Sequence, residues 1–242
     1  MQAGKPPPEQ IPDEMYSAYT LGGAIPVHHW YFNDARAEAQ PIVWTKDLVD
    51  QLIEKARLKN TSYYGATDTY LYSALEQINV QGRDVAIIGS VTPWYEAICL
   101  AYGARPISID YNPIVSQHPA ISTLTQAEYQ AAPRQFDMLL SISSIEHDGL
   151  GRYGDTLKPD GDRQAMQSAR QMLKRGGRFI LAVPVGKDAL IWNAHRIYGA
   201  IRLPLLLQGW QVVDSYGYEP NRLSADEGIW GGYQPVFVLA AE

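Results

Sequence analysis

A series of short apolar runs, separated by stretches with helical spacing, constrains the fold of this 242-residue chain more than any other feature of its sequence. Their continuous apolar character is typical of strands that are buried on both faces. Strands that alternate with helices predict a mostly parallel sheet covered by helices on both sides. The expected strands are Val85–Ile88, Pro106–Asp110, Phe136–Ile142 and Arg178–Val183.

The helices expected between these strands follow from caps and from the spacing of apolar residues. Thr92 and Pro93 are an N-cap and first-turn pair for the first of them. The two β-rich runs at 211–215 and 236–240 have no good helix between them, so we expect them to pair as an antiparallel hairpin. The helices expected in this region are 92–103, 162–174 and 203–208.

The part of the chain before residue 81 has a different character. It begins with a proline-rich segment, and two helices are then expected, one capped by Thr45 and one over 67–78. These helices either cover a pocket or cap a sheet edge. We therefore predict an N-terminal extension over 1–80 and a second unit over 81–242.

Composition excludes several classes of protein. An apolar fraction of 46% with 19% charged residues excludes a wholly disordered chain. No apolar run approaches the roughly 20 residues of a membrane-spanning helix, and the first residues lack the apolar core of a secretory signal. The formal charge of −6 lacks the basic footprint of a nucleic-acid binder, and the single Cys99, expected to be inert packing, favours a reducing cytoplasm. The 16 Tyr and 6 Trp suit a polar pocket or an interface.

Several stretches resemble the class I S-adenosylmethionine-dependent methyltransferases: VAIIGS at 85–90, SID at 108–110, FDMLLSISSIEHDG at 136–149 and LKRGGRFILAVPVG at 173–186. The loop SSIEHDGLGRYGDTLKPDGD, from Ser143 onward, resembles more narrowly an uncharacterised methyltransferase-like family. The resemblance implies a Rossmann-like α/β fold, a doubly wound, mostly parallel seven-stranded sheet with a C-terminal antiparallel hairpin, here preceded by the helical extension.

The resemblance also implies S-adenosylmethionine as the cofactor. Asp110 ends the second strand, where a carboxylate can accept both ribose hydroxyls; alternatively, it caps a turn before Asn112. Gly89 would let the backbone approach the cofactor closely. The residues expected to bind the cofactor are Gly89, Ser90, Thr92, Asp110, Tyr111 and Ser143.

The glycine turn departs from the pattern of that family, which has three glycines preceded by an acidic residue on the first strand. Ile87 stands at the acidic position, and Val91 and Pro93 stand at two of the glycine positions. Their side chains narrow the space for the methionine part of the cofactor. Cofactor binding is therefore either lost or reshaped, with one of four residues taking part: Ser90, Thr92, Trp94 or Glu96.

Glu146, His147 and Asp148 follow the fourth strand directly, where this fold places substrate chemistry. With an ordinary pKa of about 6.5, His147 is the expected base for a hydroxyl or amine nucleophile. Glu146 or Asp148 would orient its imidazole. In the alternative interpretation the two carboxylates cap the loop and His147 packs or faces solvent.

Five further residues lie on the rim where an acceptor would bind, or else form packed turns: Arg152, Tyr153, His195, Arg196 and Tyr198. No metal is predicted, because the acidic residues of this loop match no calcium-loop spacing. Nucleophile-elbow, P-loop and zinc-protease motifs do not occur in the sequence.

We expect S-adenosylmethionine-dependent methyl transfer to a small polar acceptor, with a sugar or glycan-precursor hydroxyl as the first choice. The alternative is a catalytically inactive methyltransferase-like protein that acts as a binding or scaffold module. The expected partner is a small-molecule acceptor, with no nucleic acid and no membrane, and a homo-oligomer is left open. The expected compartment is the cytoplasm.

Overall fold

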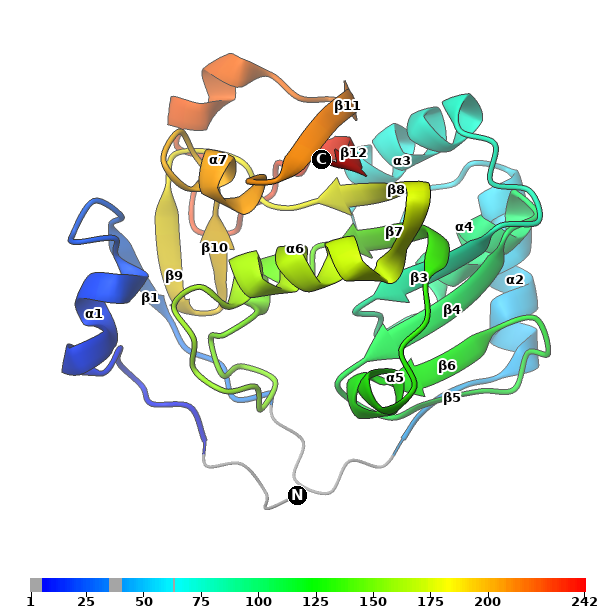
Figure 1. Ribbon diagram of the computed structural model, residues 1–242, viewed down its shortest axis with the longest axis horizontal. Helices are drawn as coiled ribbons and strands as arrows, with labels where there is room; N and C mark the ends of the chain where they lie inside the picture. Colours follow the sequence, from blue (N-terminus) through cyan, green and yellow to red (C-terminus); the bar gives the residue numbers. More distant parts are fainter. Residues whose placement is uncertain (1–5, 35–40, 63) are drawn as a thin grey trace.

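The structure is a computed structural model that describes residues 6–34, 41–62 and 64–242. A seven-stranded sheet organises these residues (Figure 1). From one edge to the other, its strands are β11 (Trp210–Tyr216), β12 (Val236–Ala241), β8 (Leu173–Ala182), β7 (Phe136–Ile142), β3 (Asp84–Ile88), β4 (Arg105–Asp110) and β6 (Ser122–Thr125).

The pairing within this sheet confirms the mostly parallel sheet and the antiparallel hairpin. The strands β6, β4, β3, β7 and β8 are mutually parallel, whereas β12 runs antiparallel to both β8 and β11. The winding direction reverses between β3 and β7, which lie side by side although β4 and β6 separate them in sequence. In an open α/β sheet, ligands bind at such a reversal, outside the carboxyl ends of the strands.

The strand β8 begins earlier than the sequence pattern indicates. The expected helix ran to residue 174, and the strand was expected only from Arg178. In the structure Leu173 already pairs with Phe136, and the chain is extended from there on. Backbone pairing with β7 therefore ends the preceding helix before the glycines at 176 and 177.

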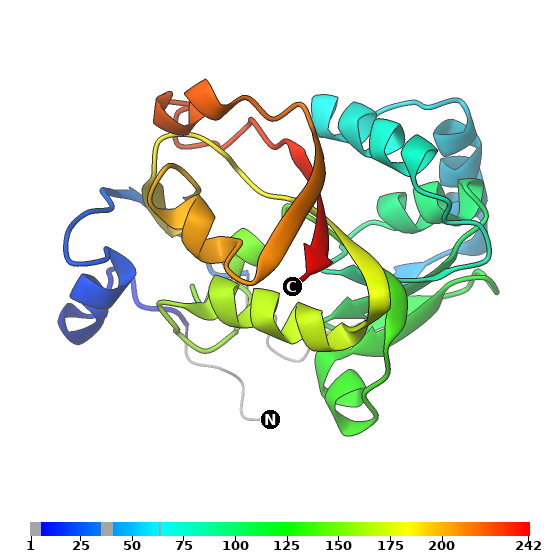
Figure 2. The same cartoon turned by 45° about the horizontal axis from the view of Figure 1, so that its top comes forward.

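Helices cover both faces of the sheet (Figure 2), and alternate residues of each strand face opposite layers. Ile87 and Leu140 pack against one layer, and Ala86 and Leu139 pack against the other. The first layer contains α3 (Ala66–Gln77) and α4 (Trp94–Ala101), with Cys99 buried in it as expected. The second contains α5 (Gln126–Ala131), α6 (Gly161–Met172) and α7 (Arg202–Leu206).

The helix α4 begins differently from the prediction. Its first residue is Trp94, whose N–H donates to the backbone oxygen of Thr92 at 2.7 Å, and no side chain caps it. Thr92 was expected to be the N-cap, but Pro93 takes that position. The side chain of Thr92 is left exposed.

Two helices before residue 81 pack against the main sheet or the helices that cover it. The helix α2 (Lys46–Arg57) begins after Thr45, whose hydroxyl accepts a hydrogen bond from the Leu48 N–H at 3.3 Å, as its sequence predicts. It packs on α4, whereas α3 lies over β11 and β12. The helix α1 (Asp13–Tyr19) was not expected, and β2 (Ile42–Trp44) pairs with β5 (Ile114–Ser116).

A buried carboxylate joins this N-terminal part to the start of α4. Asp68, in the first turn of α3, is fully buried. It accepts hydrogen bonds from the Trp94 indole N–H at 3.0 Å and from the Tyr95 hydroxyl at 3.3 Å. Ser62 donates to the same carboxylate through its backbone N–H and its hydroxyl.

A small second sheet lies beside α1, on the left of Figure 1. Its strands are β1 (Val27–Trp30), β9 (Ala189–Asn193) and β10 (His195–Ile197). The strand β10 also contacts η1 (Ile145–His147), the short helical turn that follows β7. A second such turn, η2 (Pro220–Ser224), precedes the loop that leads to β12.

Within the described ranges, no helix has the length and apolar character that crossing a membrane requires.

Candidate functional site

Three loops meet at the carboxyl ends of the central strands, next to the point where the winding reverses. They follow β3 at 89–93, β4 at 111–113 and β7 at 143–160. Every residue predicted to bind the cofactor or to act on the substrate lies on these loops, at the end of β4, or on β10 and the residue after it.

The loops after β3 and β7 touch at Gly89. This glycine has a φ of +74°, and a Cβ atom at this position would lie 2.0 Å from the Ser144 hydroxyl oxygen. Glycine is therefore required here for two reasons, the left-handed backbone and the close approach of the second loop. The contact also narrows the space beside the turn. Ser144 therefore restricts the room for the methionine part of the cofactor, a restriction that we expected from Val91 and Pro93. Val91 itself is 63% exposed.

The Asp110 carboxylate links the ends of β3 and β4. It accepts a hydrogen bond from the Ser90 N–H at 3.1 Å, and its other oxygen accepts one from the Asn112 N–H at 2.8 Å. The structure is therefore compatible with both interpretations of Asp110. One oxygen caps the turn before Asn112, and the other faces the glycine turn, where the ribose of the cofactor was expected. Each oxygen keeps a further lone pair for an external hydroxyl donor.

A second carboxylate lies directly beneath this turn. Glu96, in the first turn of α4, is fully buried and accepts a hydrogen bond from the Ser108 hydroxyl at 2.6 Å. Burial raises its pKa to about 7, although hydrogen bonds from Ser108 and Ser90 act in the opposite direction. From the sequence, Glu96 was expected only as one of the residues that take part if the turn is reshaped. In the structure its carboxylate instead accepts hydrogen bonds from Ser90 in the turn and from Ser108 in β4.

Replacing Glu96 with glutamine should stabilise the protein in a pH-dependent way. The folded-state pKa of about 7 lies above the ordinary value of 4.5, so this carboxyl favours folding below about pH 4.5 and loses that contribution as the pH rises to 7. Glutamine carries no charge and can still accept from Ser108. At pH 8 we expect a free energy of unfolding about 3 kcal/mol higher than that of the native chain, with no gain at pH 4.5. Urea denaturation at both pH values measures this difference. The exposed Glu76→Gln is the control, and an equal change at both pH values would contradict the expectation.

Beyond β7 the backbone adopts a conformation that is uncommon for a residue with a side chain. Ser143 has a φ of +51°, in the left-handed region. Its hydroxyl donates to Glu146 Oε1 at 2.7 Å and accepts from the Gln234 side-chain amide at 3.1 Å. Backbone outliers of this kind cluster at ligand sites, because the surrounding contacts must hold them in place.

Glu146 is the carboxylate most suited to exchange a proton in this loop. Its side chain is 1% exposed, and Oε2 has no hydrogen-bond partner among the described residues. Burial raises its pKa to about 7, opposed by the Ser143 hydrogen bond and by the charges of Arg152 and Arg196. A carboxyl with this pKa is present in both protonation states at neutral pH.

His147 does not have the properties that its sequence position suggested. Its Nδ1 lies 2.6 Å from the Ala194 backbone oxygen, which can only accept, so Nδ1 carries the proton and Nε2 is bare. Nε2 lies 3.7 Å from Glu146 Oε1. Burial lowers its pKa to about 3, with further contributions from the charges of Arg152, His195 and Arg196. The expected base with an ordinary pKa is thus corrected to a neutral imidazole that is difficult to protonate.

Asp148 lies on the loop after β7 and Tyr111 on the loop after β4, and burial raises the pKa of both side chains. Burial and the neighbouring Asp155 raise the pKa of Asp148 well above its ordinary value. The carboxylates of Asp148 and Asp155 also raise the pKa of Tyr111, after burial itself, which places this residue of the β4 loop close to the loop after β7. Tyr111 is nevertheless 51% exposed, as expected for a residue that lines an open edge.

The loop after β7 is fixed by its own acidic residues. Asp155 accepts from the backbone N–H groups of Gly149 at 2.7 Å and Gly151 at 3.2 Å. A Cβ atom on Gly149 would lie 2.1 Å from the Lys158 backbone oxygen, so the loop closes on itself only with glycine here. In the described part of the chain, no three His, Cys, Asp or Glu side chains are grouped as a metal site would need.

Two of the residues predicted to bind substrate belong instead to the interior. Arg196 is 1% exposed and donates to the backbone oxygens of Glu146 and Asp148, at 3.2 and 2.7 Å. Tyr198 is fully buried and donates to Asp162 at 3.0 Å. Because both buried side chains already hydrogen-bond to groups of the protein, we correct their role from substrate contacts to supports of the loop.

The other three predicted substrate residues gather around His147. The ring of Tyr153 lies 5.5 Å from that of His147, and the ring of His195 lies 6.2 Å from it. The Arg152 guanidinium donates to Asp34 at 2.7 Å and lies 4.2 Å from the centre of the Phe32 ring. The structure thus brings these three residues together with the predicted catalytic loop.

Residues distant in sequence complete this cluster, and sequence reasoning did not assign them to it. Gln234 precedes β12, Trp30 ends β1 and Trp230 lies in the loop between η2 and β12. The Trp30 ring lies 4.4 Å from that of Trp230 and 6.1 Å from that of His195. The only sequence signal was the excess of Trp and Tyr, which indicated a pocket or an interface without locating it.

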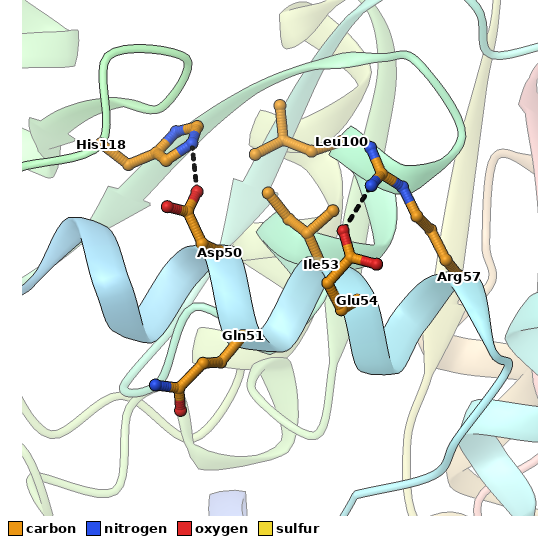
Figure 3. Close-up of a pocket in the computed structure, with 7 residues that line it drawn as sticks. All are labelled: Asp50, Gln51, Ile53, Glu54, Arg57, Leu100 and His118. Carbon is orange, nitrogen blue, oxygen red and sulfur yellow. Dashed lines mark hydrogen bonds and ion pairs between the residues drawn. The ribbon is translucent and has the colours of Figure 1, made fainter.

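A cavity of about 530 Å³ lies elsewhere, between α2, the end of α4 and the chain near His118 (Figure 3). Its charged groups satisfy one another: Asp50 lies 3.3 Å from His118, and Glu54 pairs with Arg57. None of its lining residues belongs to the three loops at the carboxyl ends of the central strands. We therefore assign no function to it.

The fold is that of solved methyltransferases. The 1,6-didemethyltoxoflavin-N1-methyltransferase of Burkholderia thailandensis, solved with S-adenosylhomocysteine, is similar at a TM-score of 0.51 and 15% identity, over 81% of this chain and 87% of that one. The glycopeptide N-methyltransferase MtfA, solved with S-adenosylhomocysteine, is similar at a TM-score of 0.50 and 11% identity, over 74% of this chain and 91% of that one. The PH0226 protein of Pyrococcus horikoshii is similar at a TM-score of 0.51 and 13% identity, over 76% of this chain and 93% of that one. At these identities the similarity shows the fold alone.

A family model described as "Caenorhabditis protein of unknown function, DUF268" matches residues 82–226, more than half of the chain. No curated protein matches the sequence.

Proposed function

We propose that this chain, which belongs to the family described as "Caenorhabditis protein of unknown function, DUF268", transfers a methyl group from S-adenosylmethionine to a hydroxyl of a small polar acceptor. A sugar or a glycan precursor is the first choice of acceptor. The observation that carries the proposal is the juxtaposition of Asp110 with the glycine turn, beside the buried Glu146 at the end of β7. The shared methyltransferase fold supports it.

The residues present fit the nucleoside part of this cofactor. Asp110 would accept from the ribose hydroxyls with the lone pairs that its two backbone hydrogen bonds leave free. Tyr111, Gly89 and Ser90 would line the same edge, with Thr92 and Ser143 at its ends. When bound, S-adenosylmethionine supplies an electrophilic methyl group.

The chain's own task is then to orient the acceptor hydroxyl and to take its proton. Glu146 Oε2 has no hydrogen-bond partner among the described residues, and the Ser143 hydroxyl donates to the other oxygen of the same carboxylate. We assign Glu146 as the base, because its pKa of about 7 suits proton acceptance at neutral pH. Neutral His147, held by Ala194 with Nε2 bare, would accept a hydrogen bond from a second hydroxyl of the acceptor and so help to orient it.

A specific observation favours the second candidate, a non-catalytic binding module of the same fold. The approach of Ser144 to Gly89 occupies space beside the turn where the methionine part of the cofactor would lie. If that space does not open, the surface around Trp230 would serve binding alone.

Titration calorimetry with S-adenosylhomocysteine tests the proposal and separates the two candidates. We expect binding by the native chain, and a dissociation constant about 10- to 100-fold higher for Asp110→Ala, since a hydrogen bond to a charged group contributes roughly 1.5–3 kcal/mol.

The matched control for Asp110→Ala is Asp84→Ala. Asp84 lies at the opposite end of β3, where it pairs with Arg105 on the surface. This variant should bind like the native chain. Absence of heat from the native chain up to millimolar ligand would instead support the binding module.

A further inference from the structure

The acceptor side of the proposed site contains buried polar atoms that nothing in the described part of the chain satisfies. They are Glu146 Oε2, His195 Nε2 and Gln234 Oε1. Unsatisfied buried polar atoms are few in folded proteins, and each calls for an explanation such as a bound ligand. Three in one neighbourhood indicate that a ligand completes the site.

The orientation of the Gln234 amide follows from its neighbours. Its nitrogen lies 3.4 Å from the Gly231 backbone oxygen, which can only accept, and 3.1 Å from the Ser143 hydroxyl. Since the Ser143 hydroxyl already donates to Glu146, it accepts from Gln234. The nitrogen of Gln234 is therefore used, and the unsatisfied Oε1 is a pure acceptor.

The nitrogen Nε2 of His195 has no hydrogen-bond partner in the described part of the chain. Burial lowers the pKa of His195 to about 4, so the ring is neutral at physiological pH. In a neutral ring Nε2 accepts from a hydroxyl or donates to one, according to the tautomer, and a hydroxyl can meet either need. The buried side chain is 6% exposed.

The three atoms belong to one continuous group of contacts. Gln234 reaches Glu146 through the Ser143 hydroxyl, as described above. Gln234 also contacts the Gly231 backbone, and a Cβ atom at that position would lie 3.3 Å from His195 Nε2. The strand β10, the loop after β7 and the loop before β12 therefore contribute to the same subsite.

The charges around this group disfavour ionic ligands. The lone pairs of Glu146 and Gln234 disfavour an anion. The positive charges of Arg152 and Arg196 disfavour a cation, and Arg196 also donates to the Glu146 backbone oxygen. Arg152 is itself paired with Asp34 and stacked on Phe32, so it is not free to hold an anion. A neutral ligand that donates several hydrogen bonds remains.

An aromatic surface adjoins the acceptors. The ring of Trp30 lies 6.1 Å from that of His195 and contacts Trp230, which is 68% exposed. Sites for small neutral ligands combine aromatic walls with a few placed polar groups. A sugar ring has both a set of hydroxyl donors and an apolar face.

We propose that Gln234 and His195, together with Glu146, form a subsite that binds the hydroxyl groups of a neutral sugar, with Trp30 and Trp230 against the sugar ring. The inference rests on the proposed function and names its acceptor class. Gln234 and His195 are buried next to Gly231, so we expect the loop that carries Trp230 to shift when the sugar binds.

The experiment compares three methyl glycosides that share one ring but differ in charge. They are methyl α-D-galactopyranoside, which is neutral, its anionic 6-carboxylate and its cationic 2-amino analogue. The methyl glucoside, mannoside and rhamnoside are tested as further neutral ligands. Saturation-transfer NMR on the full chain with S-adenosylhomocysteine present measures binding, and tryptophan fluorescence reports on the aromatic surface. We expect at least one neutral glycoside to bind, with a dissociation constant at least about tenfold lower than those of the two charged galactosides.

Two variants test the named residues. Gln234→Met keeps the length of the side chain and removes the acceptor, and His195→Phe keeps a ring beside Trp30. Each should weaken binding of the neutral glycoside about five- to tenfold, the effect expected when one neutral hydrogen bond is lost. The control Gln208→Met makes the same change at an exposed position. Thermal unfolding confirms that each variant is folded.

The outcomes separate this inference from the proposed function. If S-adenosylhomocysteine binds and no neutral glycoside does, the subsite is wrong while methyl transfer stands. If a neutral glycoside binds and the nucleoside does not, the subsite stands and the proposed function is wrong. Stronger binding of the carboxylate or the amine, or unchanged binding by both folded variants, overturns the subsite.

Discussion

Replacing Glu146 with glutamine should lower the rate of methyl transfer by about 10²- to 10⁴-fold, the range that a positioned general base contributes. The amide cannot take a proton from the acceptor hydroxyl. It still accepts from Ser143, so the left-handed turn after β7 is preserved. Since Asp110 lies on another loop, the affinity for S-adenosylhomocysteine should change less than about twofold. Formation of S-adenosylhomocysteine with the bound neutral glycoside measures the rate, and calorimetry measures the affinity.

The dependence of this rate on pH distinguishes the base from a merely structural carboxyl. Because burial raises the pKa of Glu146 to about 7, the native rate should increase as the pH rises through 7 and the carboxyl loses its proton. The glutamine variant should lack that increase. A rate controlled by His147 would instead change at about pH 3, where its lowered pKa lies.

His147→Ala should lower the rate by about tenfold or less, since the imidazole orients the acceptor through a second hydroxyl and takes no proton in the reaction. The exposed Glu76→Gln should have no effect. A loss after His147→Ala as large as that after Glu146→Gln would return the role of base to the histidine, as its place in the sequence first suggested.

Replacing Asp162 with alanine should lower the free energy of unfolding by about 3–5 kcal/mol. Arg202 forms two hydrogen bonds with this carboxylate, at 2.8 and 3.0 Å, and Arg196 Nε lies 3.8 Å from it. All three side chains are buried. Removing the one anion leaves two cations uncompensated in the interior. Urea denaturation at pH 7 measures the loss.

The matched control is Asp160→Ala, two residues earlier on an exposed turn, which should change stability by less than about 0.5 kcal/mol. Burial would raise the pKa of Asp162, but the charges of Arg196 and Arg202 outweigh it and hold the pKa below the ordinary value. The stability that Asp162 provides is therefore present above about pH 4 and is lost as the pH falls further. A loss of less than about 1 kcal/mol at pH 7 would show that the arginines find other partners.

The sheet could be predicted because each of its buried strands can be recognised from its own short stretch of sequence. A run such as Val85–Ile88 is apolar at every position, which only a strand covered on both faces requires. The start of β8 could not be predicted in this way. Leu173 is extended because Phe136 pairs with it, and nothing in the neighbouring sequence indicates that partner.

The candidate site was predictable in position and less so in chemistry. Strand ends place Asp110 and Glu146 at one edge of the sheet, and the sequence shows those ends. The pKa of His147 depends on burial by β10, and the fixed amide of Gln234 depends on Ser143, 91 residues away. Arg196 looked like a surface residue because arginine usually is one. Only the fold reveals the backbone oxygens that hold it inside.

The buried Asp68 has a consequence for how this protein can change over generations. Its carboxylate accepts the Trp94 indole N–H and the Tyr95 hydroxyl at the start of α4, immediately after the turn that would face the cofactor. A substitution of Asp68 by an apolar residue would leave these donors without an acceptor inside the protein, so it would persist only together with changes at 94 and 95. We therefore expect correlated substitutions between α3 and the start of α4, next to the cofactor turn.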